Sequence, residues 1–314
     1  MQERDLERVV AVDWSGRVDA AGQRRHIWAG VWTAGRVTLE AGRTREELAT
    51  WLIELARETP RIVVGIDCCF SFPAWFLEEH GCATVFDFWR HVAAGHGERW
   101  LARECEEVAR DERFWGKPHK RPEQFCGEGL TRSMRSTDMD NKITPKMLAG
   151  DPERAAKVKG ITPKSPFQIG GSGSVGTGSL RAMPFLLRLR EAGFRVWPFE
   201  ASLLGQKKPA PLLVKMYTRL LTGAVAKSNA EARRAYLAAK RRAGAEYAEL
   251  YSRLPHAVLA KAYASEDAFD ALVCCVEMAR VRAEFAGLRA TRDAVLRMEG
   301  ITWRPGVAKE LGGR

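Results

Sequence analysis

Residues 61–67 read Arg61-Ile62-Val63-Val64-Gly65-Ile66-Asp67, an apolar run that ends in a carboxylate. Every position between the charged ends is apolar or glycine, which is typical of a strand buried on both faces of a parallel sheet. A second run of this kind, Val9–Asp13, also ends in aspartate. We therefore expect two central strands whose carboxyl ends carry Asp67 and Asp13.

Further strands and helices are expected around these two runs. The segments His26–Trp32 and Arg36–Glu40 flank a turn at residues 33–35, so the chain is expected to open with a three-stranded meander. Thr44 and Glu47 fit a helix-capping box that precedes an apolar face at helical spacing. The remaining expected elements are helices over residues 179–192, 211–222, 229–251 and 265–285, and strands over residues 194–200 and near 301–303.

The chain has 314 residues, and no linker divides it cleanly. Residues 74–165 show poor periodicity, apart from a helix expected near residues 100–109, and they mix aromatic, basic and glycine residues. A segment this long is better interpreted as an insertion than as a loop. We expect one α/β domain over 1–314, with a large insertion after the fourth strand.

The charge balance favours a polyanionic partner. The chain has 50 lysine and arginine residues against 39 aspartate and glutamate residues, a net charge of +11, and nucleic acid is the usual partner of such a surface. A soluble surface with no partner is the plainer alternative. No apolar run approaches the ~20 residues of a membrane span, and the charged start of the chain has no signal-peptide core. We expect a cytoplasmic protein without membrane contacts.

The seven cysteines give no sign of a metal or disulfide framework. Their number is odd, no C-x-x-C spacing occurs, and two pairs are adjacent in the sequence. Zinc sites need separated thiolates on tight turns. We expect free thiols that pack as small apolar side chains, as in a reducing compartment.

Acidic residues follow three expected strands and open one helix. Asp13, Asp67 and Glu200 stand at strand ends, where open α/β sheets form their sites. Asp267 and Asp270 are three residues apart, so both can lie on one side of a helix. Converging carboxylates suit Mg²⁺ or Mn²⁺, and two such ions can clamp a phosphodiester. The catalytic candidates are therefore Asp13, Asp67, Glu200, Asp267 and Asp270.

Each acid also has a plainer explanation. Asp13 precedes Trp-Ser-Gly and fits a turn, and Glu200 fits a strand end or an ion pair with a lysine. Asp267 lies in the first turn of a helix, where the helix dipole favours an acid. The joint pattern carries more weight than any one of these residues.

A glycine-rich loop at residues 170–178 matches G-x-G-x-x-G. Glu200 lies 24 residues after Gly176, close to where a dinucleotide-binding acid would stand. However, the motif lies in mid-chain, and only one β-α-β unit follows it. A backbone-amide cradle for a substrate phosphate and a tight turn against the sheet remain open. The candidates for contacts to substrate are Ser15, Lys164, Ser165, Gly171, Gly173 and Gly176.

Four motifs recur in an order that resembles the predicted ribonuclease H-like nucleases of domain-of-unknown-function family 429. They are Val-Ala-Val-Asp13-Trp-Ser-Gly, Val-Gly-Ile-Asp67 followed by Phe-Ser-Phe-Pro73, Val-Trp-Pro-Phe-Glu200 and Glu-Asp267-Ala-Phe-Asp270-Ala-Leu. The segment Pro163–Ser179 also resembles a signature of one branch. Residues 74–160 carry little of the resemblance.

This resemblance implies a ribonuclease H-like mixed sheet flanked by helices, related to the Holliday-junction resolvases. Carried over by position, it implies Asp13, Asp67, Asp267 and Asp270 as ligands of catalytic Mg²⁺ or Mn²⁺, with Glu200 as a fifth acid. Many members have histidine where Glu266 stands. The activity of the family is itself a prediction.

The sequence thus supports three hypotheses about function. The first is a divalent-metal-dependent phosphodiester hydrolase that acts on nucleic acid. The second is a nucleic-acid-binding module without catalysis, which needs only the basic surface. The third is an actin-like nucleotide phosphohydrolase with Asp13–Gly16 as its phosphate loop, although that class usually has two copies of the core and only one is visible here.

Overall fold

The computed structural model describes residues 6–102, 111, 113–116, 164–170 and 174–312. Its centre is a mixed six-stranded sheet in the order β3-β2-β1-β4-β6-β5. The strand β2 runs antiparallel to β1 and β3, whereas β4, β6 and β5 are parallel to β1. The strands are β1 (Arg8–Asp13), β2 (Trp28–Thr33), β3 (Arg36–Glu40), β4 (Ile62–Ile66), β5 (Arg195–Trp197) and β6 (Leu212–Lys215).

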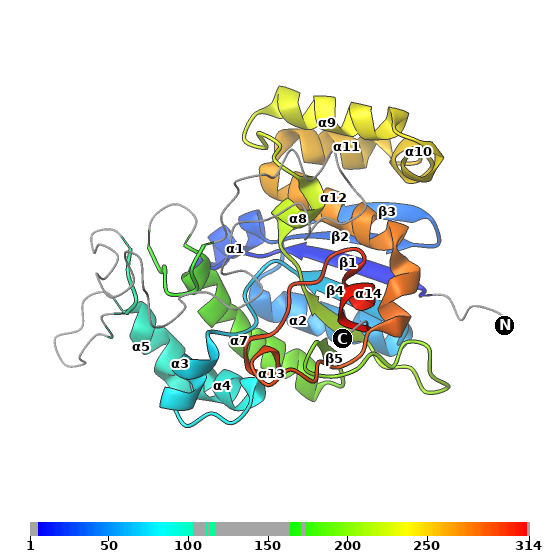
Figure 1. Ribbon diagram of the computed structural model, residues 1–314. Coiled ribbons are helices and arrows are strands. Elements are labelled where there is room, and N and C mark those ends of the chain that lie inside the picture. Colours follow the sequence, from blue (N-terminus) through cyan, green and yellow to red (C-terminus); the bar gives the residue numbers. More distant parts are fainter. Residues whose placement is uncertain (1–5, 103–110, 112, 117–163, 171–173, 313–314) are drawn as a thin grey trace.

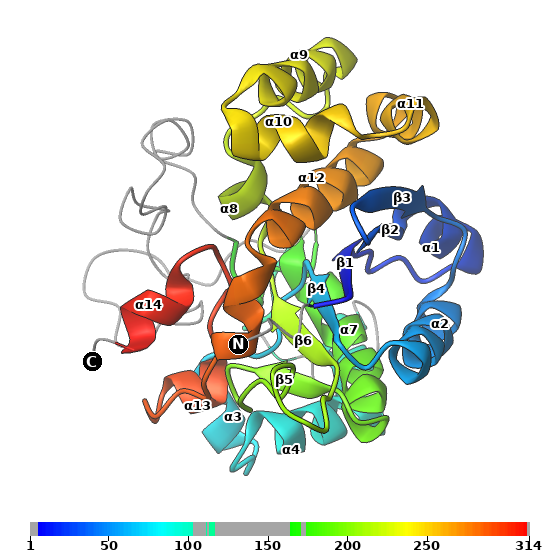
Figure 2. The same ribbon diagram turned by 90° about the vertical axis from the view of Figure 1, so that its right-hand side faces the viewer.

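Helices cover both faces of the sheet (Figures 1 and 2), which confirms the expected α/β class. Before the gap at 117–163 they are α1 (Ala20–His26), α2 (Arg45–Glu58), α3 (Ala74–Glu79), α4 (Val85–His91), a π-helical turn (Val92–His96) and α5 (Gly97–Leu101). After it they are α7 (Val175–Glu191), α8 (Thr218–Thr222), α9 (Ala230–Arg242), α10 (Ala245–Ser252), α11 (His256–Ala264), α12 (Glu266–Arg280), a 3₁₀ turn (Arg282–Gly287), α13 (Leu296–Glu299) and α14 (Val307–Gly312).

Two apolar cores lie on opposite sides of the sheet. One joins the sheet to α2, α3, α4 and α7, and the other joins it to α12 and the helices α9 to α11. Because all five residues of β4 are buried, this strand contributes to both cores, as its apolar run predicts.

The register of the central strands sets the ends of β1 and β4 side by side. Val12 of β1 pairs with Ile66 of β4 in a parallel ladder. The backbone N–H of Asp67 continues this ladder by donating to the carbonyl of Val12 at 3.1 Å. Asp13 and Asp67 therefore leave the sheet at the same edge, as the sequence predicts.

A glycine in β2 allows α12 to pack directly on the sheet. A Cβ atom on Gly30 would lie 2.5 Å from the carbonyl oxygen of Ala271 and 2.8 Å from Cβ of Cys275. Only a residue without a side chain permits this approach. The close packing brings Asp270, the neighbour of Ala271, to the edge where β1 ends.

Several expected elements are confirmed and others are wrong. The capping box of Thr44 and Glu47 opens α2 as expected. The helix α1 was not expected between β1 and β2, and residues 301–304 form no strand. Residues 212–215 form β6 rather than part of a helix, since a short run buried on both faces has no distinctive period.

The segment expected to be an insertion contains helices up to Leu101, and its later described residues include Trp115, which forms a β-bridge with Gln168. The helices α3 and α4 bury Phe76 and Trp89 completely and pack near α7 and α13. The helix expected near residues 100–109 lies mostly outside the described residues, as does most of the segment up to 163. That residues 74–165 are inserted into the domain therefore stays a prediction.

Two further findings concern the helices and the thiols of the described residues. No helix in this part of the chain is long and apolar enough to cross a membrane. The five cysteines within it are free thiols, and four of these are buried, as expected for small apolar side chains.

Candidate functional site

Three aspartates meet where β1, β4 and α12 come together, and we call Asp13, Asp67 and Asp270 the acid cluster. Asp13 ends β1, Asp67 follows β4, and Asp270 lies in the second turn of α12. Asp270 is fully buried and Asp13 is 9% exposed. The sequence predicted all three residues at this edge, and the structure brings them together.

Burial and mutual repulsion make these carboxyls weak acids. Burial, and then the charges of Asp270 and Asp67, raise the pKa of Asp13 well above its ordinary value. Burial and the charge of Asp270 raise the pKa of Asp67 to about 6, although Thr218 donates hydrogen bonds to Asp67 from its backbone and its hydroxyl. Burial also raises the pKa of Asp270. The cluster therefore favours a positively charged occupant.

The ammonium group of Lys227 stands within this cluster. Its Nζ forms an ion pair and a hydrogen bond with Oδ2 of Asp270. Burial lowers the pKa of Lys227, but the charges of Asp270 and Asp13 outweigh it, and the net pKa is raised. The sequence analysis missed Lys227, because it lies 43 residues before Asp270 in a loop with no recognisable motif.

Two of the predicted catalytic acids point to other partners. Oδ2 of Asp267 lies 2.9 Å from Nδ1 of His26 at the end of α1, so Asp267 reaches the cluster only through its charge. Glu200 accepts a hydrogen bond of 3.0 Å from the backbone of Val196 and pairs with Arg190 and Arg195. In the described structure Glu200 is thus an acid near the end of β5, as its plainer explanation predicted, but its partners are arginines where a lysine was expected.

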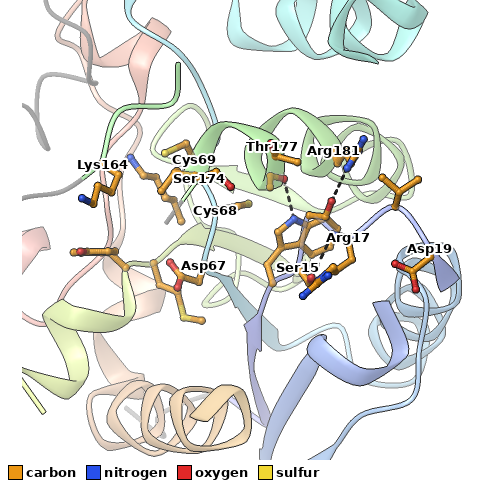
Figure 3. A pocket seen from close by; sticks show the side chains of 18 residues that line it. Ser15, Arg17, Asp19, Asp67, Cys68, Cys69, Lys164, Ser174, Thr177 and Arg181 are labelled. Atoms are coloured by element: carbon orange, nitrogen blue, oxygen red, sulfur yellow. Dashed lines mark hydrogen bonds between the residues drawn. The ribbon is translucent and has the colours of Figure 1, made fainter. Parts of the chain in front are cut away.

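A cavity of about 580 Å³ opens beside the acid cluster, and Asp67 lines it. Figure 3 shows Asp67 between Lys164 and the loop of Ser15 and Arg17 in that view. The residues Ser15, Ser174 and Thr177, which carry hydroxyls, and the basic residues Arg17, Lys164 and Arg181 also line it. An anionic ligand in this cavity would lie next to Asp67.

Two arginines hold the loop after β1 in place. Nη1 of Arg181 donates to the carbonyl of Gly16 at 2.7 Å, a bond drawn in Figure 3. Nη1 of Arg45 donates to the carbonyl of Arg17 at 2.6 Å. Arg181 is itself held by Glu98 through bonds of 2.9 and 3.0 Å. The position of Ser15 is therefore determined by helices α2, α5 and α7, which the sequence analysis did not link to this loop.

The glycine-rich segment contributes to packing where it is described. The Gly176 N–H donates to the carbonyl of Gln168 at 2.9 Å, and a Cβ at this position would lie 2.1 Å from the carbonyl oxygen of Pro166. Gly176 is therefore a close-packing glycine, and its amide is not free for a phosphate. Gly171 and Gly173 lie outside the described residues.

The two residues predicted before this segment differ in their surroundings. Ser165 is buried, and its hydroxyl accepts a hydrogen bond of 3.2 Å from the backbone of Phe167, so it stabilises a turn rather than facing the cavity. Lys164 is exposed at the mouth of the cavity, where the sequence analysis expected a phosphate contact.

The donors of the acid cluster have the chemistry of a site for a hard divalent cation, but they do not stand in ligand geometry. Oδ1 of Asp270 is buried and has no hydrogen-bond partner among the described residues. Carboxylate oxygens are the ligands that Mg²⁺ and Mn²⁺ prefer. Among the residues that the structure describes, however, no group of three His, Cys, Asp or Glu side chains is arranged to hold a metal ion. A cation at this site requires the cluster and Lys227 to rearrange.

Comparison with known proteins adds no relative: no family model, no curated protein and no solved structure matches the chain.

Proposed function

We propose that this protein is a divalent-metal-dependent phosphodiester hydrolase that acts on nucleic acid. The acid cluster is the observation that carries the proposal. Three aspartates from β1, β4 and α12 meet at one edge of the sheet, and burial and mutual repulsion raise their pKa values. Buried carboxyls that repel one another are costly to the fold, and such costs concentrate at functional sites.

The order of the acidic motifs supports the same reaction class. The sequence resembles the predicted ribonuclease H-like nucleases of domain-of-unknown-function family 429, and this resemblance implies that such acids bind metal. The net charge of +11 supports an acidic polymer as the substrate. A bound Mg²⁺ or Mn²⁺ would polarise the phosphodiester and lower the pKa of a water molecule.

The residues of the chain have separate parts in this proposal. Asp13, Asp67 and Asp270 would hold the cation, and Asp67 also lines the cavity that would receive the phosphate. Lys164 and Arg17 would attract the negative backbone of the substrate. Arg181 would keep the loop of Ser15 in position by its bond to the carbonyl of Gly16.

Cleavage of labelled nucleic acids tests the proposal. Single-stranded, double-stranded and branched DNA and RNA are incubated with the wild type, Asp13→Asn and Asp67→Asn, in Mn²⁺ or in EDTA. We expect cleavage by the wild type in Mn²⁺ alone and a loss of at least about a hundredfold in both variants. Binding should persist or strengthen in the variants, because they remove negative charge near the phosphates.

The matched control is Asp293→Asn. Asp293 is an exposed acid outside the acid cluster, and its Oδ1 accepts a hydrogen bond from the backbone N–H of Leu296. This variant should cleave as the wild type does. Binding without cleavage in the wild type would replace the proposal by the binding module. Hydrolysis of ATP or GTP in the absence of nucleic acid would replace it by the actin-like nucleotide phosphohydrolase.

A further inference from the structure

Lys227 is held next to the acid cluster by its backbone. Arg233 is 5% exposed; its Nη1 donates to the carbonyl of Lys227, and its Nε donates to the carbonyl of Ala262 at 3.1 Å. Arg219 holds the same loop by a bond of 2.6 Å to the carbonyl of Val225. Two arginines thus fix the backbone of the loop between α8 and α9 next to the acid cluster.

The two ends of the ion pair differ in their access to solvent. The side chain of Lys227 is 27% exposed, whereas that of Asp270 is 1% exposed. The ammonium can therefore move into solvent on its flexible stem, while the carboxylate cannot leave. Within the described part of the chain, Oδ1 of Asp270 lacks a hydrogen-bond partner and Oδ2 holds Lys227.

We infer that Lys227 is a tethered cation that neutralises the acid cluster when no metal is bound and competes with a divalent cation for Asp270. Metal binding would displace the ammonium from Asp270 toward solvent. Lys227 brings one positive charge to three carboxyls, so a dication can still bind. This inference rests on the proposed metal site. It concerns how the negative charge of the acid cluster is compensated in the metal-free protein.

The inference has an energetic reason. Removing the partner of a buried charge leaves that charge uncompensated, which destabilises a fold strongly. A lysine that occupies the cluster avoids this cost in the metal-free protein. The same lysine weakens metal binding, because the cation must first replace it.

The first test measures the reactivity of Lys227 in the wild type. Lysines are labelled with a small amine-reactive reagent in EDTA and in Mn²⁺, and the sites are quantified by mass spectrometry. We expect labelling of Lys227 to rise several-fold in Mn²⁺ as its ammonium leaves Asp270. The exposed Lys309 on α14 is the internal reference and should not change. Unchanged or lower labelling of Lys227 would overturn the inference.

The second test measures Mn²⁺ affinity by calorimetry. Lys227→Met keeps much of the length of the side chain and removes its charge, so it should bind Mn²⁺ at least about tenfold more tightly. Lys227→Arg and the control Lys309→Met should stay close to the wild type. In EDTA, Lys227→Met should melt at a lower temperature than the wild type, and Mn²⁺ should raise its melting temperature by the larger amount.

The outcomes separate this inference from the proposed function. Equal or weaker Mn²⁺ binding by Lys227→Met would make Lys227 a structural partner of Asp270 and overturn the inference alone. Tighter binding without cleavage of any nucleic acid would support the inference and contradict the proposed function. Absence of Mn²⁺ binding in every variant would overturn both. If Lys227→Met fails to fold, the labelling experiment on the wild type decides.

Discussion

The backbone N–H of Asp67 donates a hydrogen bond of 3.1 Å to the carbonyl of Val12. This bond extends the ladder of β1 and β4 by one residue beyond the last pair of the strands. It holds Asp67 next to Val12, the residue that precedes Asp13. The proximity of the two acids is thus a property of the sheet, and variants of their side chains should leave the backbone unchanged.

Asp67→Asn should stabilise the metal-free protein at neutral pH. Burial and the charge of Asp270 raise the pKa of Asp67 from 3.8 to about 6. The folded state therefore binds the proton more tightly than the unfolded chain, so wild-type stability falls as the pH rises from about 4 to about 6. Above pH 6 the variant should be more stable by up to about 3 kcal/mol.

Urea unfolding in EDTA between pH 4 and 8 measures this difference. The advantage of Asp67→Asn should shrink toward pH 4, where both states of the wild type take up the proton. Asp293→Asn should show no such dependence on pH. A wild type that is more stable than Asp67→Asn at pH 7.5 would contradict the raised pKa.

Gly30→Ala should disturb both the fold and the acid cluster. The new methyl group would lie 2.5 Å from the carbonyl oxygen of Ala271, so α12 must move away from β2. Overpacking of this kind costs about 1–3 kcal/mol. The shift would also displace Asp270, and Mn²⁺ affinity should fall together with the melting temperature.

Gly205→Ala is the control for this substitution, since its Cβ would meet only Cβ of Ala286 at 3.7 Å. Its melting temperature and its Mn²⁺ affinity should stay close to those of the wild type. A stable Gly30→Ala variant with unchanged metal affinity would show that the close contact between α12 and β2 does not set the position of Asp270.

Arg181→Met should lower the cleavage rate by about tenfold without preventing folding. The substitution removes the bond to the carbonyl of Gly16 and the pair with Glu98, and it frees the loop that carries Ser15. Initial rates at saturating and limiting substrate measure the effect. Arg188→Met, on the same helix and paired with Glu46, should not affect the rate. If both variants lose activity equally, the effect lies in α7 and not in the loop.

Lys164→Met should weaken nucleic-acid binding in a salt-dependent way. Lys164 is exposed at the cavity, and each lysine that neutralises a phosphate contributes about one unit to the slope of log affinity against log salt. Fluorescence anisotropy across a salt series should show this slope reduced by about one. Lys309→Met should retain the wild-type slope, and an equal loss in both variants would point to a general charge effect.

The sequence by itself determined the central strands and the acids at their ends. An apolar run such as residues 62–66 can only be buried, and the residue after a parallel strand lies at a known edge of the sheet. Asp13 and Asp67 could therefore be predicted from local pattern alone. Asp270 followed from its place in an apolar helix. The run at 212–215 was assigned to a helix because a short buried segment has no diagnostic period.

Only the tertiary structure decided which charges surround those acids. Asp267 contacts His26, and Glu200 pairs with Arg190. Lys227, in a loop 43 residues before Asp270, pairs with Asp270 in the acid cluster. Ion pairs depend on where side chains meet in space, and no spacing along the chain encodes that. Backbone pattern can thus be read from the sequence, because it is local and periodic, whereas the electrostatics of the site arise from contacts between distant segments.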